Sequence, residues 1–183
     1  HIPPWKALDA ADYPAEISRQ VADNLGDRYA EALAAGGERV YFFLWRFYTA
    51  VGSILDRNYQ PTERLAALAA ANFALGNGNY LGTAQVDGLR LHLFDNGFGR
   101  RCLVLPPGQP GKPLTVKVKG GWQLYESTGE LLNQGTNDAD VESGVGTRYL
   151  VASEIDMATR DLRAAGQPRG NAAPPPGVMD LKL

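Results

Sequence analysis

The sequence has 183 residues, which suits one ordinary domain with appendages. Hydrophobic residues make up 44% and charged residues 21% of the chain, a composition typical of a folded globular protein rather than a disordered one. The net charge of −2 argues against binding of the nucleic-acid backbone as the main function, and the single cysteine, Cys102, excludes an intrachain disulfide and any multi-cysteine metal site.

The first part of the sequence predicts an extended arm followed by a helix. Residues 1–13 begin with Ile2-Pro3-Pro4-Trp5, and two successive prolines favour an extended backbone. From Pro14 onward apolar residues recur every fourth position until Gly36-Gly37, which is a typical helix end. This spacing predicts one half-buried helix with an apolar stripe made of Ile17, Val21, Leu25, Tyr29 and Leu33.

Two further helices are expected before residue 79. The segment from Val40 to Leu55 is apolar almost throughout; it fits a buried helix or a buried strand, and its length favours a helix. Arg46 in its middle argues against a membrane span. A third helix starts after Pro61, with Leu65, Leu68, Ala69, Asn72 and Phe73 on its expected inner face.

After residue 80 the apolar period changes to two, which predicts an antiparallel sheet. Asp87-Gly88 is a tight-turn signal between two alternating runs. The runs form a meander of six to seven short strands, with an acidic loop at 135–146. The main expected strands are 83–86, 89–95, 101–105, 114–118, 122–126, 130–133 and 148–152.

The end of the chain predicts a short helix and a second arm. Ser153 followed by Asp156 resembles a helix-capping pattern and predicts a helix over 153–165. Residues 166–183 contain Pro168 and Pro174-Pro175-Pro176, which favour an extended tail. The predicted fold class is therefore α+β: a single domain over 14–165, helical over 14–78 and a sheet over 80–152, between arms at 1–13 and 166–183.

Two small groups of residues could carry chemistry. His92 and Cys102 lie on consecutive predicted strands and could form a thiol–imidazole pair. His1 and His92 are the only histidines, and a free N-terminal amine beside two imidazoles suits copper. In these two residue types the sequence resembles the histidine brace of lytic polysaccharide monooxygenases, which implies a copper site. The strand setting of Cys102 favours a small buried side chain instead, and we expect no metal and no cofactor.

Other patterns have plainer interpretations. Asp138, Asp140 and Glu142 alternate as calcium ligands do, but Ser143 stands where the loop glycine belongs, so a solvated loop is expected. The aromatic run at 41–48 could line a ligand site, although such runs more often form core. The basic residues of the sheet are expected on a solvated face; they are Arg100, Arg101, Lys112, Lys117 and Lys119.

The absence of an intact catalytic motif favours a structural or assembly role over an enzyme. We expect a subunit of a larger complex, such as a virion, appendage or secretion machine, whose terminal arms clasp neighbouring subunits in a homo-oligomer or larger assembly. The alternative is a small enzyme or ligand-binding domain that uses His92 and Cys102 or an N-terminal copper site. The sequence contains no secretory signal pattern or membrane-spanning segment, so a soluble protein is expected. The expected arm contacts are Pro3, Pro4, Trp5, Pro174, Pro175, Pro176, Met179 and Leu181.

Overall fold

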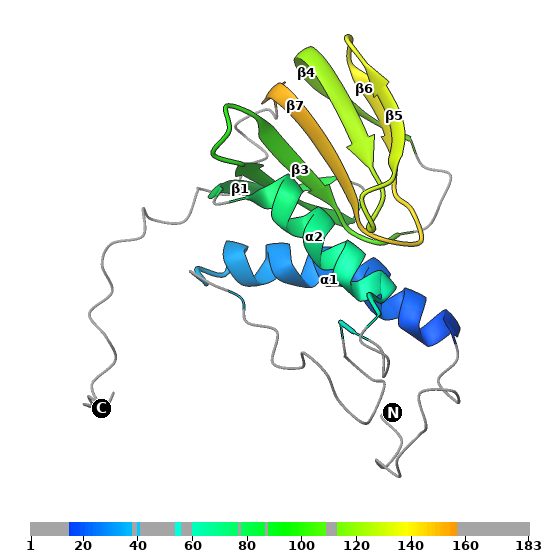
Figure 1. Ribbon diagram of the computed structural model, residues 1–183. Helices are drawn as coiled ribbons and strands as arrows, with labels where there is room; N and C mark the ends of the chain where they lie inside the picture. Colours follow the sequence, from blue (N-terminus) through cyan, green and yellow to red (C-terminus); the bar gives the residue numbers. More distant parts are fainter. Residues whose placement is uncertain are drawn as a thin grey trace, which may run out of the picture.

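A computed structural model (Figure 1) describes residues 15–37, 40, 54–55, 60–76, 78–86, 88–108 and 113–156, with side chains from Arg19 onward. Within these ranges the chain forms two helices and one antiparallel sheet of seven strands. The helices lie side by side against one face of the sheet (Figure 1). The elements are α1 (Ala15–Ala34), α2 (Glu63–Leu75), β1 (Asn79–Val86), β2 (Leu89–Asp95), β3 (Arg101–Leu105), β4 (Pro113–Tyr125), β5 (Leu131–Gly135), β6 (Ala139–Glu142) and β7 (Arg148–Asp156).

The predicted α+β fold class, with three N-terminal helices and a short C-terminal helix, is wrong. The described chain is mostly β, with α1 and α2 as its helices. The expected second helix within 40–55 falls outside the described residues except for Val40, Ile54 and Leu55, and residues 157–165 lie outside them entirely.

The expected C-terminal helix fails because strand pairing outweighs the local capping pattern. Strand β7 continues to Asp156, and Ile155 pairs with Val118 of β4 in the sheet core. Pairing with β4 supplies both backbone hydrogen bonds and a buried site for Ile155, which a helix cap alone does not provide. The expected acidic loop at 135–146 is likewise not loop throughout, because Ala139–Glu142 is strand β6, paired with β4.

The sheet runs in the order β1-β2-β3-β7-β4-β5, and β6 also pairs with β4. The two expected strands at 114–118 and 122–126 are one long strand, β4, with an irregularity between Lys119 and Trp122. Gly120 at this point has a φ of 82°, a conformation that favours glycine. The irregularity lets one strand pair with β6 near its start and with β5 near its end, so the sheet curves strongly (Figure 1).

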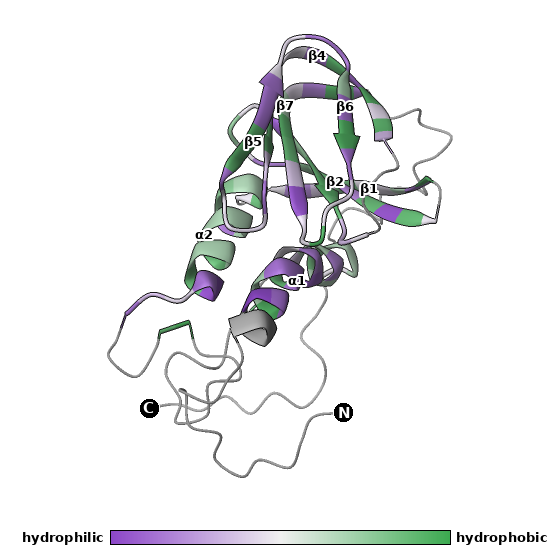
Figure 2. Cartoon of the chain, turned by 90° about the vertical axis from the view of Figure 1, so that its right-hand side faces the viewer, coloured by the Kyte–Doolittle hydropathy of each residue, from purple (hydrophilic) through white to green (hydrophobic). Residues whose placement is uncertain are grey.

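Both faces of the central strands are buried. Apolar and polar residues alternate along β6 and the first half of β4 (Figure 2), whereas four consecutive residues of β3 and four of β7 are buried. Between the helices and the sheet lies one apolar cluster, made of Ala22, Leu25, Ala30, Leu33, Ala67, Ala70, Ala71, Ala74, Leu75, Phe94, Cys102, Val104, Tyr149 and Val151. The opposite face encloses Leu91, Leu93, Leu103, Leu105, Val116, Val118, Trp122, Leu124, Ala139, Val141, Leu150, Ala152 and Ile155.

The inner face of α2 differs from the expected one. Its buried residues are mostly alanines, whereas Leu65 and Leu68 are half-buried and Phe73 is exposed. Small side chains allow the close approach of a helix to its neighbours, so the alanine face turns inward. The buried residues of α2 are Arg64, Ala67, Ala70, Ala71, Ala74 and Leu75.

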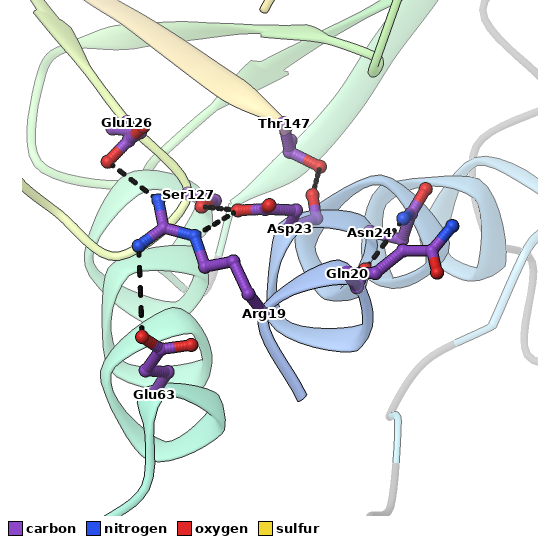
Figure 3. Close-up of polar contacts among 8 residues, drawn as sticks. All are labelled: Arg19, Gln20, Asp23, Asn24, Glu63, Glu126, Ser127 and Thr147. Carbon is purple, nitrogen blue, oxygen red and sulfur yellow. Dashed lines mark hydrogen bonds and ion pairs between the residues drawn. The ribbon is translucent and has the colours of Figure 1, made fainter. Parts of the chain in front are cut away.

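Asp23 joins α1 to two connections of the sheet (Figure 3). Its carboxylate oxygen Oδ1 accepts hydrogen bonds from Ser127 Oγ at 2.7 Å and from Arg19 Nε at 3.0 Å. Its backbone carbonyl accepts from both the backbone N–H and the hydroxyl of Thr147, each at 2.7 Å. Thr147 Oγ1 in turn accepts from the backbone N–H of Asp27, so this hydroxyl bridges two backbone groups one helical turn apart.

Arg19 extends this network to α2 and to the segment after β4. Its guanidinium lies 3.0 Å from Glu126 and 4.0 Å from Glu63, measured between charged atoms (Figure 3). We call the group of Arg19, Asp23, Ser127 and Thr147 the Asp23 network. It fixes α1 against the β4–β5 turn and the β6–β7 connection.

Loss of the Asp23 carboxylate should destabilise the fold. Asp23→Ala leaves the fully buried Ser127 hydroxyl without its acceptor and removes a charged partner of Arg19, so we expect a loss of about 2–4 kcal/mol in the free energy of unfolding. Urea denaturation measures it. Glu63→Gln is the control, because the longer and exposed Arg19–Glu63 pair should contribute less than about 0.5 kcal/mol. A loss below 1 kcal/mol for Asp23→Ala would contradict this role.

Gly26 in α1 makes room for Tyr149 of β7. A Cβ atom added at Gly26 would lie 1.7 Å from Tyr149 Oη and 2.7 Å from Cζ. Gly→Ala inside a helix normally adds about 0.5–1 kcal/mol of stability. Here we expect Gly26→Ala to cost about 1–3 kcal/mol, because Tyr149 is buried and must shift.

Thermal unfolding checks the Gly26 prediction, with a second variant as an internal test. Tyr149→Phe removes the nearest atom, so Gly26→Ala should cost less in the Tyr149→Phe background than in the wild-type chain. An unchanged or higher melting temperature for Gly26→Ala alone would show that Tyr149 does not restrict this position.

Candidate interaction surface

Large apolar side chains are exposed around the C-terminal end of α2. Phe73 of α2 is 60% exposed and Phe98, in the β2–β3 connection, is 74% exposed. The two leucines that begin β5, Leu131 and Leu132, are also exposed. Exposed aromatic rings of this size are uncommon on surfaces without a partner when they lie close together.

One ring contact, one strand pairing and one close approach to the end of α2 relate these side chains to each other. The ring of Phe73 packs edge-on against Tyr125 of β4, with ring centroids 5.8 Å apart and an interplanar angle of 79°. Tyr125 pairs with Leu131 across β4 and β5, so their side chains share one face. Phe98 lies beside Gly76, the residue that follows α2. A Cβ atom added at Gly76 would lie 3.2 Å from the Phe98 ring. We call Phe73, Phe98, Tyr125 and Leu131 the α2-end patch.

The β4–β5 turn fixes this corner of the molecule against α2. Glu126 N–H donates to the carbonyl of Glu130 and Gly129 N–H to that of Glu126, which closes the turn. Gly129 has a φ of 91° and lies close to Ala70. A Cβ atom added at Gly129 would be 3.4 Å from the Ala70 methyl group. Ser127 in the same turn donates to Asp23. The Asp23 network therefore positions β5 and Tyr125 relative to Phe73.

Strand β5 borders the α2-end patch and lies at the edge of the sheet. Within the parts of the chain that the structure describes, it pairs with β4 on one side and with no strand on the other. Four of its five residues are exposed, and Leu131–Gly135 contains no charged residue and no proline. Edge strands are usually protected by such residues, as β6 is by Asp140 and Glu142. An unprotected edge of this kind suits pairing with another strand.

Polar groups surround the patch on the side of β4. Arg100 donates at 3.3 Å to the side chain of Gln123, two residues before Tyr125 on β4, and this hydrogen bond is exposed to solvent. Glu126 is paired with Arg19 next to Tyr125. An apolar centre with a polar rim is the usual composition of a protein–protein interface.

Cys102 is buried between the sheet and the helices. It pairs with Phe94 on β2 and is fully inaccessible to solvent. Burial raises the pKa of its thiol well above the usual range, so the thiolate that a nucleophile needs is disfavoured at neutral pH. This environment opposes a nucleophilic role for Cys102.

His92 lies on the neighbouring strand and faces the same side. Its Nδ1 forms a hydrogen bond of 2.8 Å with Thr83 Oγ1, and Thr83 also bonds to the Tyr80 hydroxyl. His92 Nε2 is buried and has no hydrogen-bond partner within the described part of the chain. Sequence reasoning missed Thr83 and Tyr80, although the hairpin register that the Asp87-Gly88 turn implies could have placed Thr83 opposite His92.

The remaining predicted site residues cannot be placed. His1 and all the expected arm contacts, from Pro3, Pro4 and Trp5 to Pro174, Pro175, Pro176, Met179 and Leu181, lie outside the described residues. Among the residues that are described, no group of three or more His, Cys, Asp or Glu side chains is arranged to hold a metal ion. Neither α1 nor α2 is long and apolar enough to cross a membrane.

The buried imidazole predicts a pH dependence of stability. Burial lowers the pKa of His92 below its ordinary 6.5; Arg90 acts in the same direction and Glu31 opposes it. Between the folded and unfolded pKa values the unfolded chain binds more protons, so acidification through this window destabilises the fold. We expect the free energy of unfolding to fall from pH 7.5 to 5.5, with a slope of at most about 1.4 kcal/mol per pH unit.

Denaturant titrations at several pH values measure this slope, with His92→Gln as the comparison. Glutamine keeps a hydrogen-bonding side chain near Thr83 but does not titrate, so the slope should flatten. Burial raises the pKa of Asp27 from 3.8, which gives a slope of the opposite sign at lower pH. The comparison therefore stays above pH 5.5. An identical slope in the wild-type and His92→Gln chains would contradict the assignment.

No family model matches the sequence, and no curated protein matches it. Solved structures with partial similarity include a CENP-C domain of Drosophila melanogaster (19% identity, TM-score 0.17), CENP-C bound to CAL1 (16%, 0.16) and the CENP-C cupin domain (16%, 0.15). The matches cover 40%, 51% and 51% of this chain, and 64%, 90% and 90% of those chains. TM-scores this low carry no argument about the fold or function of this protein.

Proposed function

We propose that this chain is a protein-interaction domain that assembles with further copies of itself through the α2-end patch. The observation that carries the proposal is the contact chain from exposed Phe73 through Tyr125 to Leu131 on an unprotected edge strand. The patch thus combines apolar rings with a strand edge. Both features favour a protein as the partner over a small molecule.

The energetics of the patch support this role. Burying an exposed phenylalanine side chain contributes about 1.5–3 kcal/mol, and Phe73 and Phe98 both retain most of their exposure in the single chain. Association with a partner would remove this apolar surface from water. The Phe73 ring already rests edge-on against Tyr125, and this contact reduces the side-chain entropy that Phe73 would lose on binding.

The assembly that we propose is a larger protein complex, such as a virion, an appendage or a secretion machine. In this proposal the arms at 1–13 and 166–183 clasp neighbouring subunits and the folded domain supplies the acceptor surface. The patch offers a docking site of the kind that such arms require. The burial of Cys102 weighs against the alternative of a cysteine enzyme.

Polar replacement of the two rings should separate the copies. The double variant Phe73→Ser, Phe98→Ser removes most of the apolar area of the patch, and both side chains are exposed, so the fold should persist. We expect the wild-type chain to have a native mass in multiples of 19.8 kDa and the double variant to approach 19.8 kDa. Light scattering behind a sizing column measures both.

The control for this experiment is Val145→Ser. Val145 lies in the β6–β7 connection and is 77% exposed, so it matches the phenylalanines in exposure while lying outside the patch. Its replacement should leave the native mass unchanged. A wild-type monomer, or an oligomer that survives in the double variant, would contradict the proposed assembly surface.

A further inference from the structure

We propose that the occupant of the β5 edge is the C-terminal segment 178–183 of a second copy, added to the sheet as an eighth strand. This inference deepens the proposed function and rests on it. It assigns the partner segment, the mode of binding and the acceptor strand.

The β5 edge offers backbone groups and an apolar face. In an antiparallel sheet the outer strand exposes N–H and C=O groups that a further strand can pair with, and no described strand occupies this side of β5. Leu131 faces the same side as Tyr125, which touches Phe73. An added strand with apolar residues on that side would extend the α2-end patch outward and cover it.

Segment 178–183 has the sequence Val-Met-Asp-Leu-Lys-Leu. Met179, Leu181 and Leu183 alternate with Asp180 and Lys182, which is the period-two pattern of a strand with one apolar face. Its six residues are enough to pair along the five residues of β5. The apolar side chains would lie on the side of Leu131 and Tyr125, and the two charged side chains would face away from that side. The charged pair would also give the new outer strand the protection that β5 lacks.

The linker favours a second copy over the same chain. Residues 157–177 separate β7 from the segment and contain Pro168 and Pro174-Pro175-Pro176. Fully extended they span about 70 Å at roughly 3.3 Å per residue, about twice the diameter of a domain of this size. Consecutive prolines favour an extended backbone and oppose tight chain reversal, so we expect the segment to be offered more readily to a neighbouring copy than to its own β5. If each of two copies adds its segment 178–183 to β5 of the other, both β5 edges are paired and the dimer is closed.

The first experiment measures the native mass of the chain lacking residues 178–183 and of the Leu131→Lys, Leu132→Lys variant. Both leucines are exposed, so lysine should be tolerated in the fold while a charged edge resists strand addition. We expect the wild-type chain to have about twice the mass of the 19.8 kDa monomer and both variants to be monomeric. Val145→Lys is the control and should remain dimeric.

The second experiment tests direct binding. A fluorescently labelled peptide of residues 174–183 is titrated with the chain lacking 178–183, and anisotropy reports binding. We expect saturable binding that weakens at least about tenfold with a Leu181→Asp peptide or with the Leu131→Lys, Leu132→Lys acceptor. Circular dichroism verifies that each acceptor variant is folded, so that lost binding is not mistaken for unfolding.

The outcomes separate this inference from the proposed function. If the chain lacking 178–183 still associates, and Phe73→Ser, Phe98→Ser abolishes that association, the patch is the interface and strand addition is refuted. If the peptide binds but the wild-type chain is a monomer, the segment docks on its own body and the second copy is refuted. Dissociation of the truncated chain together with peptide binding that depends on Leu131 and Leu132 supports the full proposal.

Discussion

Asp23 joins the three parts of the molecule on which the candidate surface depends. Its carboxylate accepts from Ser127 in the β4–β5 turn, and its carbonyl accepts twice from Thr147 before β7. Because the same turn packs on Ala70 of α2, the position of β5 relative to Phe73 follows from this one buried aspartate. A buried carboxylate is costly without hydrogen-bond donors, so the two donors to Asp23 Oδ1 favour this arrangement of α1 and the turn.

The exposed aromatic patch is a consequence of how α2 packs. Its alanines turn toward α1 and the sheet, where small side chains allow close approach, and this rotation leaves Phe73 outside. Tyr125 then covers one edge of the Phe73 ring, while Leu131 extends the same face onto a strand without charged or proline residues. The apolar surface and the open strand edge therefore lie side by side. A partner that uses both gains apolar burial and backbone hydrogen bonds together.

The environment of His92 and Cys102 disfavours a catalytic role for either side chain. His92 and Cys102 lie on the paired strands β2 and β3, and both side chains are buried. Burial lowers the pKa of His92 and raises the pKa of Cys102, so both groups are held neutral near pH 7. A thiol–imidazole ion pair, which requires both groups to be charged, is disfavoured by this environment.

Local sequence patterns were enough to predict α1 and the β1–β2 hairpin. The apolar stripe ending at Gly36-Gly37 indicated α1, and Asp87-Gly88 between alternating runs indicated the β1–β2 hairpin, because turn chemistry and periodicity act over a few residues. The end of β7, the buried face of α2 and the place of β5 in the sheet depend on contacts between residues far apart in the sequence. Ser153–Asp156 carries a helix cap yet continues β7, since long-range pairing with β4 outweighs a single local cap. The periodicity of α2 predicted Phe73 in the core, but Phe73 is exposed. The alanine face of α2 fits against its neighbours and is buried instead. The edge position of β5 likewise follows from strand order, which no local pattern encodes.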